Sequence, residues 1–341
     1  MSSDTDAQTD RQHPIEYFLE DITYQGKKPR TRTAYERVLT DFEEYLDSRG
    51  LNFDDANHRD CMAYVHRLRG TVASSTVATY ASYLHRFYDY MVQVGRFDEN
   101  PMSLVLEEID ESINTDPARR DISVVEMQDF FADVAHPLDR AVIGTLLKTG
   151  MRAGELCNLD LRDLKLAATP TESEHRANLD GRDDAVYVDS EPSMGQEYHG
   201  EERTASNKRM RATTIPVDEE LGYLLREYLA VRPDPRSVAD PLFLSMSDGW
   251  GKRLTPDMVH HLVESHARDA GWYRVGGGPE ENVTPHYFRH FFTTHLRDRT
   301  GDRGIVKYLR GDVAKDVIDT YTHDWGNRVR DVYESNIYRL L

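Results

Sequence analysis

Cysteine is nearly absent from this 341-residue chain, which has only Cys61 and Cys157, far apart in the sequence. Two cysteines in unrelated contexts supply neither a disulfide framework nor the ligand spacing of a metal site. The chain also lacks a run of about eighteen apolar residues, which excludes a membrane-spanning helix, and its polar start lacks the apolar stretch of a secretion signal. We therefore expect a cytoplasmic protein with no membrane partner, no metal and no other cofactor.

Lysine is scarce as well, with eight lysines against thirty-four arginines, and the net charge is −18. Such acidity weighs against DNA as a partner, because the phosphate backbone attracts basic residues and repels acidic ones. The acidic excess is spread along the whole chain, a pattern typical of proteins from salt-loving archaea. In concentrated salt the long-range repulsion is screened, so close arginine contacts can still bind DNA. The composition therefore weakens a DNA-binding hypothesis without excluding it.

Hydrophobic spacing divides the chain into two domains. Residues 1–13 are acidic and aperiodic, and we interpret them as a disordered leader. Apolar residues at helical spacing predict a helical domain over residues 14–108, followed by a polar linker at 109–120 and a second domain at 121–341. The aromatic stripe from Tyr80 to Met91 is more typical of a core than of a platform for stacked bases.

A basic cluster interrupts the acidic first half between its first two predicted helices. Its members are Lys27, Lys28, Arg30 and Arg32. Two interpretations stay open, a solvated loop and a contact with DNA phosphates.

The second domain is predicted to be mainly α-helical with a small antiparallel sheet, an α+β fold. Helices are expected from about 124, at 138–147, 218–231 and 255–270, and β-branched segments at 185–189 and 213–217 predict strands, with a shorter one near Leu164. Residues 168–184 and 190–203 are rich in Glu, Asp, Ser, Pro and Gly. We expect them to be acidic excursions too polar to pack, without a chemical role.

Three short motifs carry candidate chemistry, and each is weak alone. TGMRAGEL, at 149–156, places Arg152 just after a glycine that ends an apolar helix. TPHYFRH, at 284–290, opens a helix with His286 and Arg289 three residues apart on one face, near an anion-favouring helix N-terminus. IDTYTH, at 318–323, contains Tyr321. The order of the three motifs is specific: an arginine comes first, a histidine with a second arginine follows, and a tyrosine stands near the C-terminus.

Because these three motifs occur in this order, the sequence resembles the tyrosine recombinases across about residues 14–325. This family includes the Xer-type and phage-integrase enzymes. The resemblance implies a helical SAM-like core-binding domain and a catalytic domain that close around double-stranded DNA. It also implies strand cleavage and rejoining through a 3′-phosphotyrosyl intermediate, without a cofactor.

The resemblance assigns roles residue by residue. Arg152 and Arg289 would hold the scissile phosphate, and Tyr321 would attack it. His286 would assist proton transfer, and Glu155 would orient its neighbours. The family's catalytic lysine lies eight residues before a proline that ends a hairpin strand, which matches Lys208 before Pro216. Arg209 and Arg211 compete with Lys208 for this role and are otherwise expected to bind DNA.

One position departs from the family pattern. Nine residues before the tyrosine, where the family has histidine or tryptophan, this chain has Asp312. A carboxylate there would repel the phosphate unless it is protonated, points away, or pairs with an arginine such as Arg310. Either Asp312 is a tolerated variant, or the chain binds DNA without cutting it. A third hypothesis, a type IB topoisomerase, shares the same chemistry.

The segment after Tyr321 has a helical apolar pattern of its own. Its apolar members are Val329, Val332, Tyr333, Ile337 and Leu340. Such a tail helix packs either onto its own domain or, as the resemblance implies, onto a neighbouring subunit. Either way, we expect several copies, a tetramer, to assemble on DNA. The sequence specifies neither the target site, nor the direction of recombination, nor an accessory protein.

Overall fold

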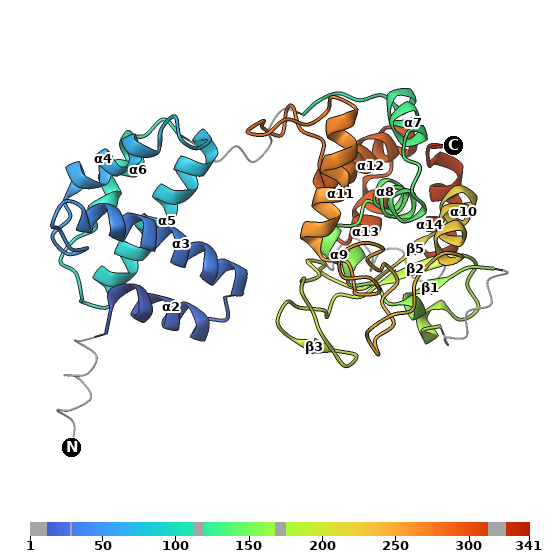
Figure 1. Ribbon diagram of the computed structural model, residues 1–341, viewed down its shortest axis with the longest axis horizontal. Helices are drawn as coiled ribbons and strands as arrows, with labels where there is room; N and C mark the ends of the chain where they lie inside the picture. Colours follow the sequence, from blue (N-terminus) through green and yellow to red (C-terminus); the bar gives the residue numbers. More distant parts are fainter. Residues whose placement is uncertain (1–11, 28, 112–118, 168–174, 313–324) are drawn as a thin grey trace, which may run out of the picture. The chain divides into compact units, whose positions relative to one another are not determined.

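The computed structural model describes residues 12–27, 29–111, 119–167, 175–312 and 325–341 (Figure 1). The chain divides into two compact units, Met1–Pro117 and Ala118–Leu341. Most of the predicted leader, together with Lys28, much of the predicted linker and Tyr321, lies outside the described residues. In the described parts, no helix has the length and apolar character needed to cross a membrane.

The first unit is helical. Its helices are α2 (Pro14–Tyr24), α3 (Pro29–Asp47), α4 (His58–Leu68), α5 (Ser74–Gln93) and α6 (Met102–Glu108). Aromatic rings fill its core, as where Phe18 meets Phe87 edge-on at 5.5 Å between ring centroids. In the aromatic stripe of α5, Leu84, Phe87, Tyr88 and Met91 are buried. This part of the stripe therefore packs the core and cannot stack on bases.

The basic cluster does not form the loop that the sequence suggested. Helix α3 already begins at Pro29, so Arg30 and Arg32 lie in its first turn. Proline suits this place, because the first turn of a helix has no partner for its backbone N–H. Lys27, Arg30 and Arg32 are all exposed. Arg30 and Arg32 thus project from the first turn of α3, whereas Lys27 lies just before it.

The second unit is built around α8 (Pro137–Thr149), which is buried along nearly its whole length. Packed against it are α9 (Ala153–Cys157), α10 (Glu219–Leu229), α11 (Pro256–Asp269) and α12 (Pro285–Thr300) (Figure 1). Helices α7 (Val124–Ala132), α13 (Arg303–Arg310) and α14 (Trp325–Asn336) complete the helical part. Side chains cap the starts of two of these helices, since the Ser123 hydroxyl accepts from the Glu126 amide and Asp218 accepts from Leu221.

A three-stranded antiparallel sheet lies beside the helices. It comprises β1 (Leu164–Lys165), β2 (Ala185–Val188) and β5 (Thr213–Pro216), in the order β1-β2-β5. Val186 pairs with Ile215 in the centre of the β2–β5 ladder, and both side chains are buried. The mainly helical fold with a small antiparallel sheet is therefore confirmed.

The long connection between β2 and β5 contradicts the expectation that residues 190–203 cannot pack. We call residues 190–207 the strap. It contains a short hairpin, β3 (Glu197–Tyr198) with β4 (Glu201–Glu202). Arg203, on the strap, is fully buried and binds the buried carboxylate of Asp160. The strap packs because its charges find buried partners, although it has few apolar side chains. Residues 175–184 also pack, through Leu179 and the ion pairs of Arg176.

The chain end packs onto its own unit. Val329, Tyr333, Tyr338 and Leu340 are buried in the core of the second unit. The Tyr333 hydroxyl donates to the carbonyl of Lys148 at 2.9 Å, and the Tyr338 hydroxyl donates to that of Leu147. In this structure the tail helix α14 therefore packs in cis.

A buried lysine ties this tail down and gives a prediction about stability. The ammonium of Lys148 has no exposed surface and contacts Asp218 at 2.7 Å, Glu220 at 2.6 Å and the Tyr338 carbonyl at 2.6 Å. Lys148→Met would leave two carboxylates and a carbonyl without their shared donor. We expect it to lower the free energy of unfolding by about 3 kcal/mol in urea denaturation, because breaking a buried ion pair leaves uncompensated charge. Exposed Lys252→Met is the control and should change it by less than about 0.5 kcal/mol; equal effects of the two substitutions would contradict the role of Lys148.

Candidate active site

Arg152 is held at the start of α9 by a backbone and a side-chain contact with Glu155. Its amide donates to Glu155 Oε2 at 3.0 Å, and its Nη1 donates to Glu155 Oε1 at 2.8 Å. The chain reaches this position through Gly150, which ends α8 in the left-handed region at φ 60°. A Cβ at Gly150 would lie 2.3 Å from the ring of Phe292, so no other residue fits without movement. Gly150, the glycine noted in the sequence, therefore determines where the backbone of Arg152 lies.

Arg289 reaches the same place from α12. Its guanidinium is almost completely buried, and its Nη1 donates to the Gly150 carbonyl at 2.6 Å. Burial and the neighbouring charge of Arg152 lower the pKa of Arg289 to about 10, so it remains charged near neutral pH. Arg289 thus joins the end of α8 to the start of α12 and keeps a positive charge inside the fold.

His286 lies at the start of α12, one turn before Arg289. Thr284 occupies the N-cap position of α12, but its side chain makes no capping hydrogen bond. The His286 side chain is exposed, but desolvation by the surrounding protein and the positive charges of Arg119, Arg289 and Arg152 hold its pKa below the ordinary value. Its imidazole is therefore neutral near pH 7 and able to accept a proton.

Asp312 lies where three guanidinium groups converge. Arg289 Nη2 contacts both carboxylate oxygens at 2.8 Å, Arg152 Nη2 contacts one at 3.0 Å, and Arg310 Nη2 contacts the other at 2.9 Å. Burial opposes ionisation of Asp312, but Arg289, Arg310 and Arg152 outweigh it and hold the pKa of Asp312 below its ordinary value. Of the three arrangements that the sequence left open, the structure has the one in which the carboxylate pairs with arginine.

Lys208 and its neighbours alternate between exposed and buried positions after the strap. Lys208 and Met210 are exposed, whereas Asn207 and Arg209 are buried. The Lys208 carbonyl accepts from Arg152 Nη1 at 3.0 Å, which brings this part of the chain to the arginine cluster. The Lys208 side chain is therefore exposed, and its backbone lies beside Arg152.

Arg209 does not occupy the DNA-contacting position expected of it. Its side chain has no exposed surface, lies 3.2 Å from Glu155 Oε2 and donates to the Leu309 carbonyl at 3.1 Å. Arg209 also crosses closely over Gly311, where a Cβ would lie 2.7 Å from its Nη1. Arg209 therefore fixes Glu155 and the end of α13 from inside the domain. Arg211 is half-buried, with its guanidinium 5.4 Å from the ring centre of Tyr308.

The structure thus brings together most of the residues singled out in the second unit. Arg152, Glu155 and Lys208 meet Arg289 and Asp312 through the contacts above, with His286 one turn away on α12. Sequence motifs indicated no role for Arg119, whose charge acts on His286, and suggested Arg310 only as a partner for Asp312. Arg310 could have been found as the cation two residues before Asp312 at the end of a helix.

Comparisons with known proteins identify the family of this chain. Residues 15–95 match the family described as phage integrase, N-terminal SAM-like domain, and residues 175–328 match the phage integrase family. Tyrosine recombinase XerD of Shewanella oneidensis is 24% identical over 331 residues, covering 94% of this chain and 95% of the relative. XerD of Listeria innocua is 27% identical, covering 93% and 95%, and XerC of Pelobacter propionicus is 23% identical, covering 92% and 90%.

Solved structures share the fold. The Tn1549 transposon integrase in complex with a circular intermediate DNA has a TM-score of 0.63 at 19% identity, covering 94% of this chain and 98% of that one. A lambda integrase dimer bound to a COC' core site has a TM-score of 0.60 at 14% identity, covering 92% and 77%. The chain belongs to the phage integrase family of tyrosine recombinases. Its sequence relatives place it with the Xer-type members.

Proposed function

We propose that this protein is a site-specific DNA recombinase that cleaves and rejoins strands through a 3′-phosphotyrosyl intermediate on Tyr321. The observation that carries the proposal is the convergence of Arg152, Arg289 and Arg310 on a single anionic group. Forked guanidinium groups in a partly buried site bind phosphate oxygens and neutralise the charge that grows on them in the transition state. In this structure the carboxylate of Asp312 stands where such an anion would bind.

The chemistry requires one nucleophile and two proton transfers. The oxygen of Tyr321 forms a bond to phosphorus as the bond to the 5′-oxygen breaks. A tyrosine hydroxyl has an ordinary pKa near 10, so it needs a base, and we assign acceptance or relay of its proton to His286, whose lowered pKa keeps it neutral. We assign the proton that the leaving 5′-oxygen gains to the ammonium of Lys208. Rejoining runs the same steps in reverse, and no metal or external energy source is needed.

DNA contacts and assembly are further parts of the proposal. We assign phosphate contacts to Lys27, Arg30 and Arg32 around the start of α3, and to Arg211 near Lys208. Lys28 is assigned with them from the sequence alone. We also propose a tetramer on DNA, supported by the lambda integrase tetramer bound to a Holliday junction, which has a TM-score of 0.61 at 14% identity. The interpretation of the acidic composition as an adaptation to salt stays a prediction.

A second candidate function rests on Asp312. Because its carboxylate occupies the arginine cluster, the chain could bind DNA without cutting it.

A type IB topoisomerase would instead relax plasmids that lack any recombination site, so plasmid relaxation separates that hypothesis from recombination.

Trapping the covalent intermediate tests the proposed function. The purified protein is incubated in high salt with duplex DNA from the region flanking its own gene, nicked so that the cleaved fragment is released. We expect a covalent complex whose DNA-linked peptide contains Tyr321, and no complex with Tyr321→Phe. The binding-only function would replace recombination if the wild type binds this DNA in a mobility-shift assay but forms no covalent complex. Attachment to another tyrosine would overturn the assignment of Tyr321.

A further inference from the structure

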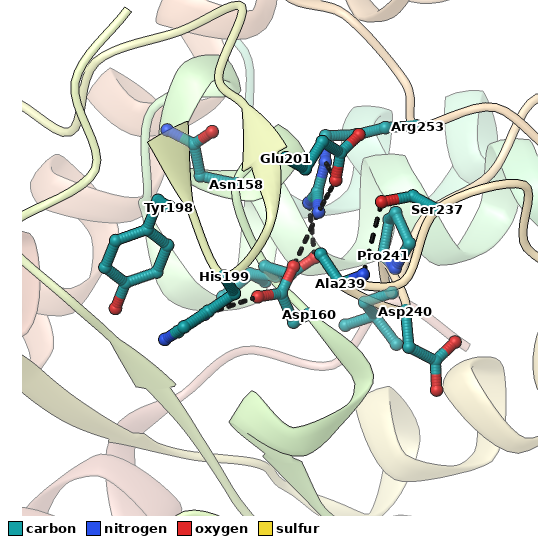
Figure 2. A network of polar contacts seen from close by, with 12 residues as sticks. Asn158, Asp160, Tyr198, His199, Glu201, Ser237, Ala239, Asp240, Pro241 and Arg253 are labelled. Carbon is teal, nitrogen blue, oxygen red and sulfur yellow. Dashed lines mark hydrogen bonds and ion pairs between the residues drawn. The ribbon is translucent and has the colours of Figure 1, made fainter. Parts of the chain in front are cut away.

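A buried ionic network lies beside the arginine cluster, and the mechanism above makes no use of it (Figure 2). At its centre is the Asp160 carboxylate, which has no exposed surface. Arg203 Nη2 lies 2.9 Å from Asp160 Oδ2, and Arg253 Nη2 lies 2.6 Å from Oδ1. Figure 2 shows Asp160 between Arg253 and His199, whose Nδ1 lies 3.2 Å from the carboxylate.

The charges of this network are nearly balanced. Glu201 Oε2 lies 2.6 Å from Arg253 Nη2 and 3.8 Å from Arg203 Nη1, so two carboxylates face two guanidinium groups. Burial opposes ionisation of Asp160, but Arg203 and Arg253 outweigh it and keep the pKa of Asp160 below its ordinary value. Buried ion pairs of this kind add little net stability, because desolvation offsets their attraction, but they can specify one arrangement of the chain.

The network joins three separate parts of the second unit. Asp160 follows α9, Arg203 belongs to the strap, and Arg253 lies shortly before α11. Arg253 Nη1 also donates to the carbonyls of Cys157 and Leu159, at 3.0 and 3.1 Å. The end of α9, the helix that starts at Arg152, is thereby tied to the strap.

Asn158 lies two residues before Asp160 in the chain and hydrogen-bonds the strap residues that precede Lys208. Asn158 Nδ2 donates to the Ala205 carbonyl at 3.0 Å and to Asn207 Oδ1 at 2.8 Å. Asn207 donates in turn to the Asp189 carbonyl at 2.8 Å, at the end of β2. Lys208 is the next residue along the chain, and its carbonyl accepts from Arg152. Two sets of contacts therefore hold the backbone at Lys208. One set comes from Asn158, near Asp160, and the other comes from the arginine cluster.

We propose that Asp160, acting with Arg203, Arg253 and Asn158, is a positioning residue for Lys208, the proton donor to the leaving 5′-oxygen. This inference rests on the proposed function. The network touches no reacting atom; it sets where the strap ends and therefore where the Lys208 ammonium meets the leaving group. Its loss should impair the protonation step more than DNA binding or attack by Tyr321.

A sulfur substitution at the leaving group isolates that step. In the nicked trapping substrate, sulfur replaces the bridging 5′-oxygen at the scissile phosphate. The P–S bond breaks to release a thiolate, which needs no proton because thiols have a pKa near 8.5, far below that of an alcohol. Cleavage of this substrate is therefore independent of Lys208. Lys208→Ala should lose cleavage of the oxygen substrate by about a hundredfold and regain near wild-type cleavage with sulfur.

Two substitutions test the network itself. Asp160→Asn removes the central charge with little change in shape, and Asn158→Ala cuts the hydrogen-bond chain without disturbing a buried charge, which keeps the test valid if Asp160→Asn folds poorly. Each should cleave the oxygen substrate about tenfold more slowly and the sulfur substrate within about twofold of wild type. His266→Ala, which breaks a half-buried pair with Asp139, is the control for general destabilisation and should show no dependence on the leaving atom.

The outcomes separate this inference from the proposed function. Absence of a covalent complex with the wild type on either substrate would overturn the proposed function itself. If Lys208→Ala is not rescued by sulfur, the assignment of Lys208 fails and the positioning role fails with it. If Lys208→Ala is rescued but a folded Asp160→Asn or Asn158→Ala variant is equally slow on both substrates, or as fast as wild type on both, only the positioning role is overturned.

Discussion

Arg289→Lys is expected to slow formation of the covalent complex by at least about a hundredfold in single-turnover assays, although it keeps the positive charge. The arginine makes contacts in two directions, from Nη1 to the Gly150 carbonyl and from Nη2 to Asp312 and the Arg310 carbonyl. A lysine ammonium is a single point charge and cannot reproduce this fork. The scissile phosphate would therefore lose its contact with a guanidinium group that burial holds in one orientation.

Arg297→Lys is the matched control for this prediction. Arg297 lies on the same helix, α12, but its side chain is 46% exposed and its ion pair is with the adjacent Asp298. We expect unchanged cleavage from Arg297→Lys, because exposed ion pairs contribute little. DNA binding in a mobility-shift assay should fall much less than cleavage in Arg289→Lys. Near wild-type cleavage by Arg289→Lys would remove this residue from the phosphate site.

Local patterns in the sequence predict the helical part of this structure well. The starts of α10, α11 and α12 follow from Asp218, Thr255 and Pro285, because capping residues and first-turn prolines act over a few neighbouring positions. The buried face of α5 follows from its helical spacing in the same way. Arg152 and Arg289 also follow from short motifs, each at the start of a helix.

The strap was misjudged because its stabilising contacts are not local. Residues 190–203 look like a solvated segment when their charges are counted along the chain. Asp160, Arg203 and Arg253, however, are widely separated in sequence and neutralise one another only in the folded domain. The burial of Arg209 had no local signal in the sequence, because the charged Arg209 is buried whereas the apolar Met210 beside it is exposed. The position of Tyr321 lies outside the described residues, so its role is inferred from sequence motifs.

Asp312→Asn is expected to change DNA affinity and stability in opposite directions. In the structure the Asp312 carboxylate occupies the guanidinium groups that the proposed mechanism gives to the scissile phosphate. A bound phosphate must share or displace this carboxylate, and like charges a few ångströms apart repel strongly in a partly buried site. Removing the charge should therefore tighten binding of the nicked duplex by about tenfold, or 1.4 kcal/mol. A duplex with an uncharged methylphosphonate at the scissile position should show no such gain.

The same substitution should destabilise the DNA-free protein. Arg152, Arg289 and Arg310 would face one another without their shared anion, so we expect the Tm to fall by a few degrees. Because the folded-state pKa of Asp312 lies below its unfolded value of about 3.9, its stabilising contribution is complete above that pH and lost as the pH falls through the folded pKa. The Tm difference between wild type and Asp312→Asn should thus be constant from about pH 5 to 8 and shrink below about pH 4.

Asp298→Asn is the control for Asp312→Asn, since Asp298 is 58% exposed and pairs with the adjacent Arg297. It should alter neither DNA affinity nor Tm. If Asp312→Asn instead weakens binding of the phosphate duplex, the carboxylate serves to hold the arginines in place for DNA and does not compete with it. Asp312→His then separates the two hypotheses for this position. Cleavage by the wild type identifies Asp312 as a tolerated variant, whereas cleavage that appears only with histidine shows that aspartate has switched off an otherwise intact site.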